Sequence, residues 1–338
     1  MKKSLYKYLL NIGLVLLTSL LVYFLVLKGQ EETIIESLRN ISFKSFIVLA
    51  GIVLLWQIFI SMILVCYARI YKKDYSFKEG FINSLVACLF NGITPSSSGG
   101  QFAQLYVFSK QGVRSCDGAS ILWMDFIIYQ MVLCIYGFIM IFSRFNEYYN
   151  RFSSLFIFVI IGFIVDIFVI FFLYALGKSE RFLKWVTSVG LNIAHKLHFV
   201  DNIEETKKTI NDTVIKFVSE ANALKKRKNV IINATLLTIL RLTAYYSIPF
   251  VVFITLGVKP TLSLYLDCLT IGSFVAISSS MIPIPGASGG TEVIFMSMFA
   301  SLFNPILTKT AMLLWRVFSY YLLLLVGAFA FVYVKIKN

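Results

Sequence analysis

Charged residues are scarce in this chain. Asp, Glu, Lys and Arg make up 14% of its 338 residues, whereas a soluble globular domain carries about 25%. Hydrophobic residues account for 58% of the chain and aromatic residues for 16%. This composition excludes an ordinary soluble domain. It indicates a polytopic integral membrane protein, because several apolar runs reach the roughly 20 residues that a helix needs to cross a bilayer.

Residues that bind metals or form disulfides are few and dispersed. The two histidines, His195 and His198, are three residues apart and would share one face of a helix. No carboxylate or cysteine constellation completes a metal site there, so we expect interfacial residues. The five cysteines have neither metal-site spacing nor a disulfide framework. The sequence therefore predicts no metal, no cofactor and no catalytic residue.

Acidic residues are also few. There are 17 Asp and Glu against 31 Lys and Arg, which gives a formal net charge of +14. In a soluble protein this charge would suggest a nucleic-acid partner. In a membrane protein, lysine and arginine collect in cytoplasmic loops and near anionic lipid head groups. We therefore expect membrane phospholipid, and no nucleic acid, as the partner.

The apolar runs predict an all-α membrane protein with six full spans. The first run follows a basic start, as in a signal peptide. Its apolar core is too long and no clean cleavage site follows it, so we expect a retained helix. The six predicted spans are 8–27, 46–68, 119–142, 155–176, 230–256 and 311–334.

Two further apolar regions are each interrupted by a polar run rich in glycine and serine. Region 81–108 contains "NGITPSSSGGQFAQ", and region 262–303 contains "PIPGASGGTE". Neither arm of the first region can cross about 30 Å at 1.5 Å per residue, which predicts a re-entrant hairpin. The longer arms of the second region leave two full spans open, but its similarity to the first favours a hairpin.

Basic residues gather in segments that this arrangement places on one side of the membrane. They are the N-terminus, loop 69–80, segment 177–229 and the tail. Segment 177–229 has eleven Lys or Arg and six Asp or Glu. Its amphipathic stretches predict helices along the membrane surface, with Trp185 near the head groups. The positive-inside rule makes this side, and both termini, cytoplasmic.

The two polar runs align with each other without gaps. "TPSSSGG" at 94–100 matches "IPGASGG" at 284–290, so equivalent residues are 190 positions apart. The chain then divides into a first membrane repeat, 1–142, and a second, 143–338, each with two spans, a broken hairpin and a third span. The halves start on opposite sides, which predicts an inverted repeat. Broken segments at matching positions of inverted halves indicate a substrate site near the membrane midplane.

Six charged residues lie in or beside apolar segments, where each costs roughly 2.5–3.5 kcal/mol at the centre of a membrane helix. Asp125 and Arg316 occupy nearly equivalent places in the two halves and could pair with each other. Arg241 could hold a lipid phosphate or a carboxylate, and Glu292 could meet a cationic head group. For each residue, a purely structural ion pair is the alternative. The six are Asp125, Asp166, Arg241, Asp267, Glu292 and Arg316.

Three stretches resemble a known family. They are "NGITPSSSGGQFAQLYVF", "SSSMIPIPGASGGTEVIF" and, near the C-terminus, "LLWRVFSYYLLLLVGAF". The chain resembles the lysylphosphatidylglycerol synthase transmembrane, or flippase-like, family over nearly its whole length. This family includes the N-terminal membrane part of the bacterial multiple peptide resistance factor.

The resemblance implies a role in a bacterial plasma membrane. In the full-length factor, a C-terminal domain moves lysine from lysyl-tRNA onto phosphatidylglycerol. The membrane part moves the product to the outer leaflet, where its charge repels cationic antimicrobial peptides. The resemblance implies head-group binding by residues of both runs, which are Pro95, Ser96, Ser97, Ser98, Gly99, Gly100, Gln101, Pro285, Gly286, Ser288, Gly289, Gly290, Thr291 and Glu292.

Three functions remain open at this stage. The first is a lipid translocase, in which the two halves rock around a polar cavity and Arg241 or Arg316 holds the phosphate. The second is a membrane transferase acting on lipid, such as a phosphatidylglycerol lysyltransferase. We do not expect that activity here, because the sequence ends after its last apolar segment and segment 177–229 is too short for an acyltransferase domain. The third is a membrane subunit of a separate synthase, or a homo-oligomer.

Overall fold

The structure is a computed structural model that describes Glu36, Arg39 and residues 41–337, except 96, 144, 153–155, 197–217, 280, 281 and 283. The regular structure in these residues is helical, and none of them belongs to a strand. The helices are α3 (Phe43–Ala68), α4 (Phe77–Ile93), α5 (Gly99–Lys110), α6 (Ser115–Ser143), α7 (Phe145–Phe152), α8 (Phe156–Lys178), α9 (Glu180–Lys196), α11 (Lys228–Thr255), α12 (Leu262–Ser279), α13 (Gly290–Phe299), α14 (Pro305–Arg316), the π-helix η2 (Val317–Tyr321) and α15 (Leu322–Lys337).

Six segments of the described chain are long and apolar enough to cross a membrane. Five of them confirm predicted spans: α3, α6, most of α8, α11, and the continuous helix formed by α14, η2 and α15. The predicted span 8–27 lies outside the described residues. The sixth segment is α12, for which the sequence favours an arm of a hairpin and leaves a full span open. Its partner α13 has 10 residues and rises only about 15 Å, so region 262–303 is not two full spans.

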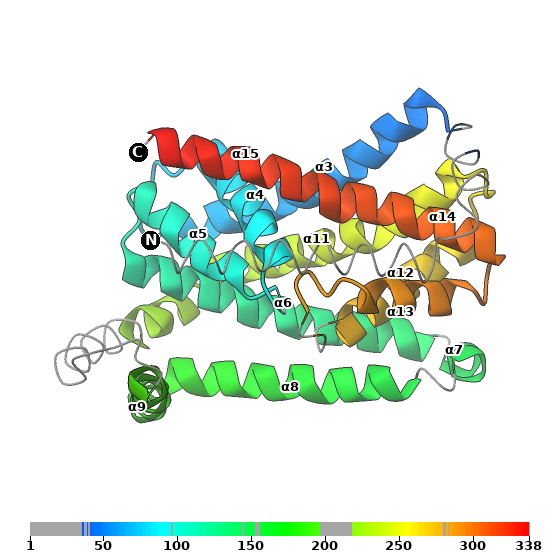
Figure 1. The fold of residues 1–338 in the computed structure, drawn as a ribbon. Coiled ribbons are helices and arrows are strands. Elements are labelled where there is room, and N and C mark those ends of the chain that lie inside the picture. The colour runs from blue at the N-terminus through cyan, green and yellow to red at the C-terminus, as the bar shows by residue number, and fades with distance from the viewer. Residues whose placement is uncertain are drawn as a thin grey trace.

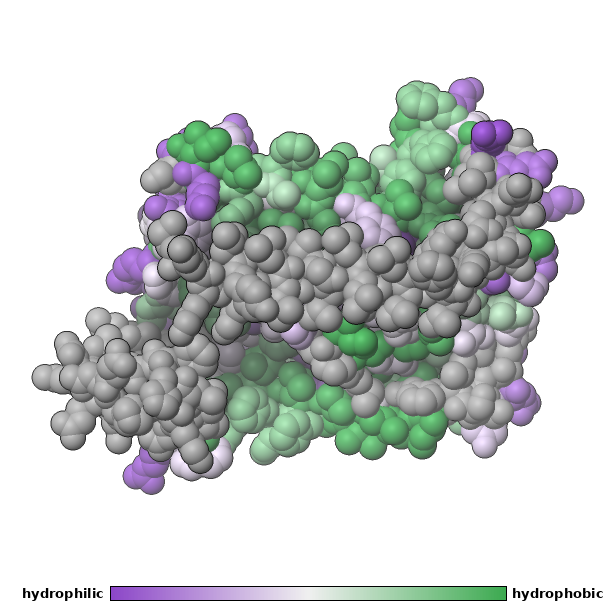
Figure 2. Space-filling view, viewed as in Figure 1, coloured by the Kyte–Doolittle hydropathy of each residue, from purple (hydrophilic) through white to green (hydrophobic). Residues whose placement is uncertain are grey.

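The helices form a bundle with an apolar belt. Figure 1 shows α11, α12 and α6 between α15 on one side and α8 on the other. The apolar window of α12 is 67% buried, whereas that of α8 is 17% buried. Figure 2 shows hydrophobic residues over the middle of the molecule and hydrophilic residues gathered at its two ends. This distribution is typical of a protein whose middle faces lipid.

Basic residues from three separate segments lie at the same end of the bundle. The ammonium groups of Lys78, before the first hairpin, and Lys337, in the tail, both lie over the ring of Tyr333. Lys225 lies over the rings of Trp123 and Tyr174, at 5.0 and 4.8 Å from their centroids. The structure thus brings basic residues of loop 69–80, segment 177–229 and the tail to one end (Figure 1), as the six-span arrangement requires, and the basic N-terminus lies outside the described residues. That this end faces the cytoplasm stays a prediction.

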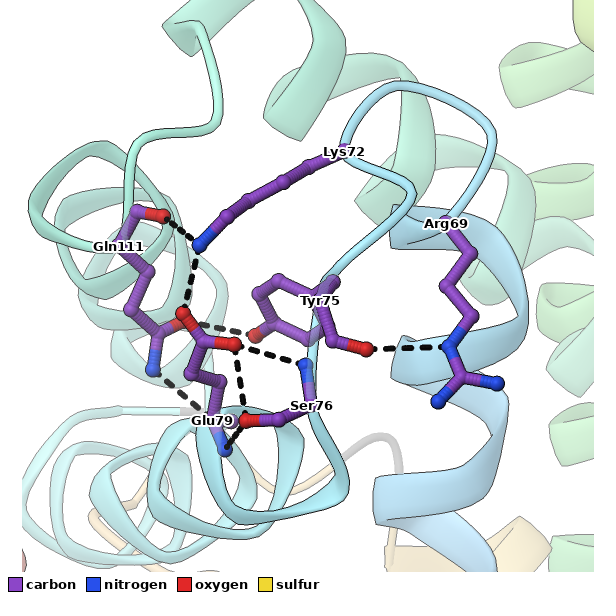
Figure 3. Close-up of polar contacts among 6 residues, drawn as sticks. All are labelled: Arg69, Lys72, Tyr75, Ser76, Glu79 and Gln111. Carbon is purple, nitrogen blue, oxygen red and sulfur yellow. Dashed lines mark hydrogen bonds and ion pairs between the residues drawn. The ribbon is translucent and has the colours of Figure 1, made fainter.

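Helices α4 and α5 are antiparallel neighbours whose outer ends are tied together (Figure 3). Lys72 donates to the carboxylate of Glu79 at 2.7 Å and to the carbonyl oxygen of Gln111 at 3.0 Å. The side chain of Gln111 accepts from the hydroxyl of Tyr75 and donates to the carbonyl oxygen of Glu79. The α4–α5 segment therefore starts and ends at one place. That it enters a membrane from one face stays a prediction.

Glu79 also begins α4, because it forms a capping box with Ser76. Burial alone would raise the pKa of Glu79. The hydrogen bonds from Lys72 and from the amide and hydroxyl of Ser76 outweigh burial and lower the pKa below its ordinary 4.5. A lowered folded-state pKa adds stability above the ordinary value, and this stability is lost as pH falls through the folded-state value.

We therefore expect acid to destabilise the wild type more than a Glu79→Gln variant. The difference should stay below about 1 kcal/mol, because the carboxylate is partly exposed and solvent screens it. Unfolding midpoints of both proteins at pH 7 and at pH 3.5 measure the effect. Glu180→Gln, at an exposed position of α9, is the matched control. Equal acid shifts in the Glu79→Gln variant and the wild type would contradict the assignment.

The hydrophilic insert is described in part. α9 is seen nearly along its axis in Figure 1, whereas α8 runs across the view, so the chain turns sharply between them. Trp185 on α9 is 62% exposed. This geometry fits a helix lying along a membrane surface. His195 belongs to α9, and His198 lies outside the described residues.

Candidate functional site

The first helix break joins the end of α4 to the start of α5. Thr94 is extended, and its hydroxyl donates to the carbonyl oxygen of Phe90 at 2.6 Å and accepts from the amide of Gly99 at 2.8 Å. The side-chain oxygen of Asn91 accepts from the amide of Gly100 at 3.0 Å. The first amides of a helix have no partner within it. Here the end of α4 supplies those partners to α5.

This contact explains the first glycine pair. A Cβ on Gly99 would lie 2.5 Å from the Thr94 side chain, and a Cβ on Gly100 would overlap the amide of Asn91. Real Cβ contacts are not this short. Glycine at both positions thus lets the two side chains reach the amides. We expect any larger residue at either position to displace its capping side chain.

The second break repeats the turn that precedes the glycine pair of the first. Ser97 and Ala287, which are equivalent in the alignment, have positive φ values of 52° and 50°. The amides of Ser97 and Ser98 donate to carbonyl oxygens three residues earlier, at 3.2 Å each, and those of Ala287 and Ser288 do so at 2.8 and 3.1 Å. The gap-free alignment is therefore matched by the same turn before each glycine pair, whereas Gly289 has a positive φ and its equivalent Gly99 already belongs to α5. The inversion of the two whole halves stays a prediction.

The two breaks differ in how the next helix is capped. At the second break, the amide of Gly289 donates to a carboxylate oxygen of Glu292 at 2.7 Å. Gly289 has a φ of 87°, and a Cβ there would meet nothing within 4 Å. Glycine at this position is therefore needed for its backbone conformation and not for space. The hydroxyl of Thr291 donates within the same turn to Ala287 and lies 3.1 Å from that of Ser279.

The two breaks meet midway along the bundle (Figure 1), where Pro95 and Ser98 are exposed and Pro285 and Ser288 are buried. Pro95 and Pro285, equivalent in the alignment, form an isolated antiparallel bridge. This bridge brings Ser98 and the first glycine pair into one region with Gly286 and Ser288. Gln101 is exposed on the first turn of α5, and Ser96 lies outside the described residues. A head-group role for the residues of the two runs stays a prediction.

Two ion pairs lie within the apolar part of the bundle. Arg316 Nε is 2.8 Å from a carboxylate oxygen of Glu292, and both side chains are almost completely buried. Arg241 Nη1 is 3.7 Å from Asp125 Oδ2. The predicted pair of Asp125 and Arg316 is therefore wrong. Arg316 ends α14, which packs beside α13 and Glu292, whereas Asp125 on α6 faces α11 and Arg241.

Several charged atoms of these pairs have no hydrogen-bond partner among the described residues. They are Asp125 Oδ1, Arg241 Nη1, Arg316 Nη2 and Arg316 Nε, the last of which lies close to Glu292 but is not aligned for a hydrogen bond. At 3.7 Å, Arg241 and Asp125 are too far apart for a hydrogen bond. The guanidinium of Arg241 also lies 4.6 Å from the ring centroid of Tyr129. A buried polar atom without a partner costs about 1–3 kcal/mol or more, so this region has donors and an acceptor to offer a ligand or water.

The other buried carboxylates hold helices together. Asp166, in the middle of α8, accepts from the side-chain amide of Gln130 at 3.0 Å. Asp267, near the start of α12, accepts from the hydroxyl of Tyr148 at 2.7 Å. Within the described residues, no group of three or more His, Cys, Asp or Glu is placed to hold a metal ion.

The sequence reasoning missed three polar residues at the breaks. Asn91 and Thr94 cap α5. Both are polar residues shortly before the glycine pair, and this pattern could have predicted that they cap the next helix. Tyr320, on η2, donates to the carbonyl oxygen of Gly92 at 2.9 Å. This contact joins residues 228 positions apart, so no local sequence pattern predicts it.

Comparison with known proteins agrees with this architecture. A search of curated proteins finds no match to the chain. The family model described as "Lysylphosphatidylglycerol synthase TM region" matches residues 10–327, which include both helix breaks and both ion pairs. The chain therefore belongs to the lysylphosphatidylglycerol synthase transmembrane-region family.

Proposed function

We propose that the chain is a membrane lipid translocase that moves phosphatidylglycerol or its lysyl ester between leaflets, and so supports resistance to cationic antimicrobial peptides. One observation carries the proposal. Two similar helix breaks meet midway along an apolar bundle, the second of them beside the Arg316–Glu292 pair, and the buried arginines keep unpartnered polar atoms. Polar groups within a membrane are costly and usually mark a substrate path.

The chemistry of these pairs suits a lipid that carries both charges. Arg241 Nη1 and Arg316 Nη2 are donors without a hydrogen-bond partner, and a phosphate oxygen accepts strongly from a guanidinium. Asp125 Oδ1 is an acceptor without a partner, and an ammonium group would supply the missing donor. In this proposal the arginines hold the phosphate and Asp125 holds the lysyl ammonium.

The capping contacts leave three glycine amides of the two runs with no hydrogen to offer a head group. The amides of Gly99, Gly100 and Gly289 already donate to side chains of the protein. In this proposal the glycines shape the passage and the charged side chains bind the head group. The protein would work in a bacterial plasma membrane with its basic end in the cytoplasm. A separate synthase or a second copy of the chain stays a predicted partner.

A leaflet assay tests the proposal. The full chain is reconstituted in liposomes that contain head-group-labelled phosphatidylglycerol, its lysyl ester or phosphatidylcholine, and a membrane-impermeant quencher reports the outer leaflet. We expect faster exchange of the first two lipids than of phosphatidylcholine. Arg241→Gln should slow both by roughly tenfold, the loss expected for one hydrogen bond to a charged group. Asp125→Asn should slow the lysyl ester more than phosphatidylglycerol.

The matched control is Gly51→Ala, because a Cβ at Gly51 on α3 meets nothing within 4 Å. Its exchange rates should equal those of the wild type. Equal exchange of all three lipids would indicate non-selective scrambling and contradict the head-group assignment. No protein-dependent exchange of either phosphatidylglycerol lipid would contradict the translocase and favour the transferase or subunit function.

A further inference from the structure

Tyr320 sits where the last long helix departs from α-helical geometry. The five residues of η2, Val317–Tyr321, form a π-helix between α14 and α15. π-Helical turns are rare and occur frequently at functional sites. Among the described residues, both hydrogen bonds of the Tyr320 hydroxyl run to the two helix breaks.

The first set of contacts joins Tyr320 to the α4–α5 segment. Its hydroxyl donates to the carbonyl oxygen of Gly92, in the last turn of α4, at 2.9 Å. A Cβ on Gly92 would lie 3.3 Å from the ring of Tyr320 and would overlap Leu324 on α15. The bare backbone of Gly92 thus allows the last helix to lie directly against the first break.

The second set of contacts joins Tyr320 to the α12–α13 segment. The hydroxyl of Ser288 donates to the oxygen of Tyr320 at 3.4 Å. A Cβ on Gly286, which has a φ of 58°, would overlap the hydroxyl of Tyr320. One phenol ring therefore occupies the space between Gly92 of the first segment and Gly286 of the second.

A third contact joins Tyr320 to the buried ion pair. The guanidinium of Arg316 lies 5.0 Å from the ring centroid of Tyr320. Arg316 in turn pairs with Glu292, which accepts from the amide of Gly289. A continuous chain of contacts thus runs from the second break, through the ion pair and Tyr320, to the first break.

The breaks also touch directly, through an antiparallel bridge between Pro95 and Pro285. Neither proline has an amide hydrogen to donate, whereas Tyr320 brings a side-chain donor from a third segment to the first break. We propose that Tyr320 is the positioning residue that holds the two breaks together, and that its hydrogen bond to Gly92 opens when a lipid head group passes between them. This proposal rests on the proposed translocase function.

Hydrogen–deuterium exchange on the full chain in lipid nanodiscs tests the link without lipid transport. Tyr320→Phe removes only the hydroxyl and keeps the ring. We expect exchange to quicken roughly fivefold at both 91–104 and 284–292, the change expected from one hydrogen bond. Tyr321→Phe, one residue later on the same π-helix and 38% exposed, is the matched control and should change neither segment.

A purely structural role for the hydroxyl predicts a different pattern. A hydroxyl that only caps the end of α4 would quicken exchange at 91–104 alone, and that result, like no change at either segment, would overturn the proposal that it links both breaks. Ser288→Ala is the second variant and should quicken both segments less, because its contact with Tyr320 is longer.

Leaflet exchange of phosphatidylglycerol separates this inference from the proposed function. If opening of the breaks limits transport, Tyr320→Phe should quicken leaflet exchange by up to about fivefold. Should the wild type move no lipid, the proposed function fails, and coupled hydrogen exchange at both breaks would still support the link. Should the wild type move lipid while Tyr320→Phe leaves both hydrogen exchange and transport unchanged, the link fails alone.

Discussion

Glu292→Ala is expected to lower the free energy of unfolding by about 3–5 kcal/mol, the cost of removing one partner from a buried ion pair. Glu292 is 2% exposed and Arg316 is 6% exposed, so the arginine would stay charged and uncompensated in an apolar bundle. The variant also loses the carboxylate that caps Gly289 at the start of α13. Denaturant unfolding in mixed micelles, followed by circular dichroism, measures the change.

Replacing both partners together shows how much of the lost stability comes from leaving Arg316 without its partner. A Glu292→Leu/Arg316→Met variant should recover much of the lost stability, because apolar side chains of similar size often replace a buried pair without cost. Asp125→Asn is the internal comparison and should cost less, since the Asp125–Arg241 pair is longer, at 3.7 Å against 2.8 Å, and less buried. A Glu292→Ala protein as stable as the wild type would show that water reaches Arg316 and that the pair is not dry.

The spans and the breaks follow from local sequence. Long apolar runs have no alternative to a helix within a bilayer, since every backbone group needs a partner. Pro95 and the glycine pair at 99–100 stop one helix and start another, as the sequence predicts. The alignment at an offset of 190 residues also predicts that equivalent positions share a backbone, and Ser97 and Ala287 do so. These features depend on residues within a few positions of each other.

The partners across the bundle do not follow from sequence. Equivalent places in two repeats predict a pair of Asp125 with Arg316, yet each has another partner. Sequence spacing gives the face of a helix but not the neighbour that it meets, and α13 ends after 10 residues, which brings α14 alongside it. The contact of Tyr320 with Gly92 depends on the rotation that a π-helical turn introduces. No sequence period signals that turn.

Gly327→Val is expected to lower the free energy of unfolding by about 1–3 kcal/mol, the usual cost of overpacking a buried contact. A Cβ at Gly327 would lie 2.5 Å from the carbonyl oxygen of Leu85 and 3.1 Å from the backbone nitrogen of Leu89. Both atoms belong to the backbone of α4, which cannot rotate aside as a side chain would. The whole of α15 must therefore move away from α4.

That movement should also reach the helix breaks. α15 directly follows η2, so displacing it draws the hydroxyl of Tyr320 away from Gly92 and should quicken hydrogen exchange at 91–104. Gly51→Val is the matched control, because a Cβ at Gly51 meets nothing within 4 Å and the change should stay within about 0.5 kcal/mol. Equal unfolding midpoints for the two variants would show that α15 does not pack against α4 through Gly327. The other outcome is a destabilised Gly327→Val protein with unchanged hydrogen exchange at 91–104. That result would show that α15 moves while Tyr320 keeps its place, with the backbone of η2 changing between them.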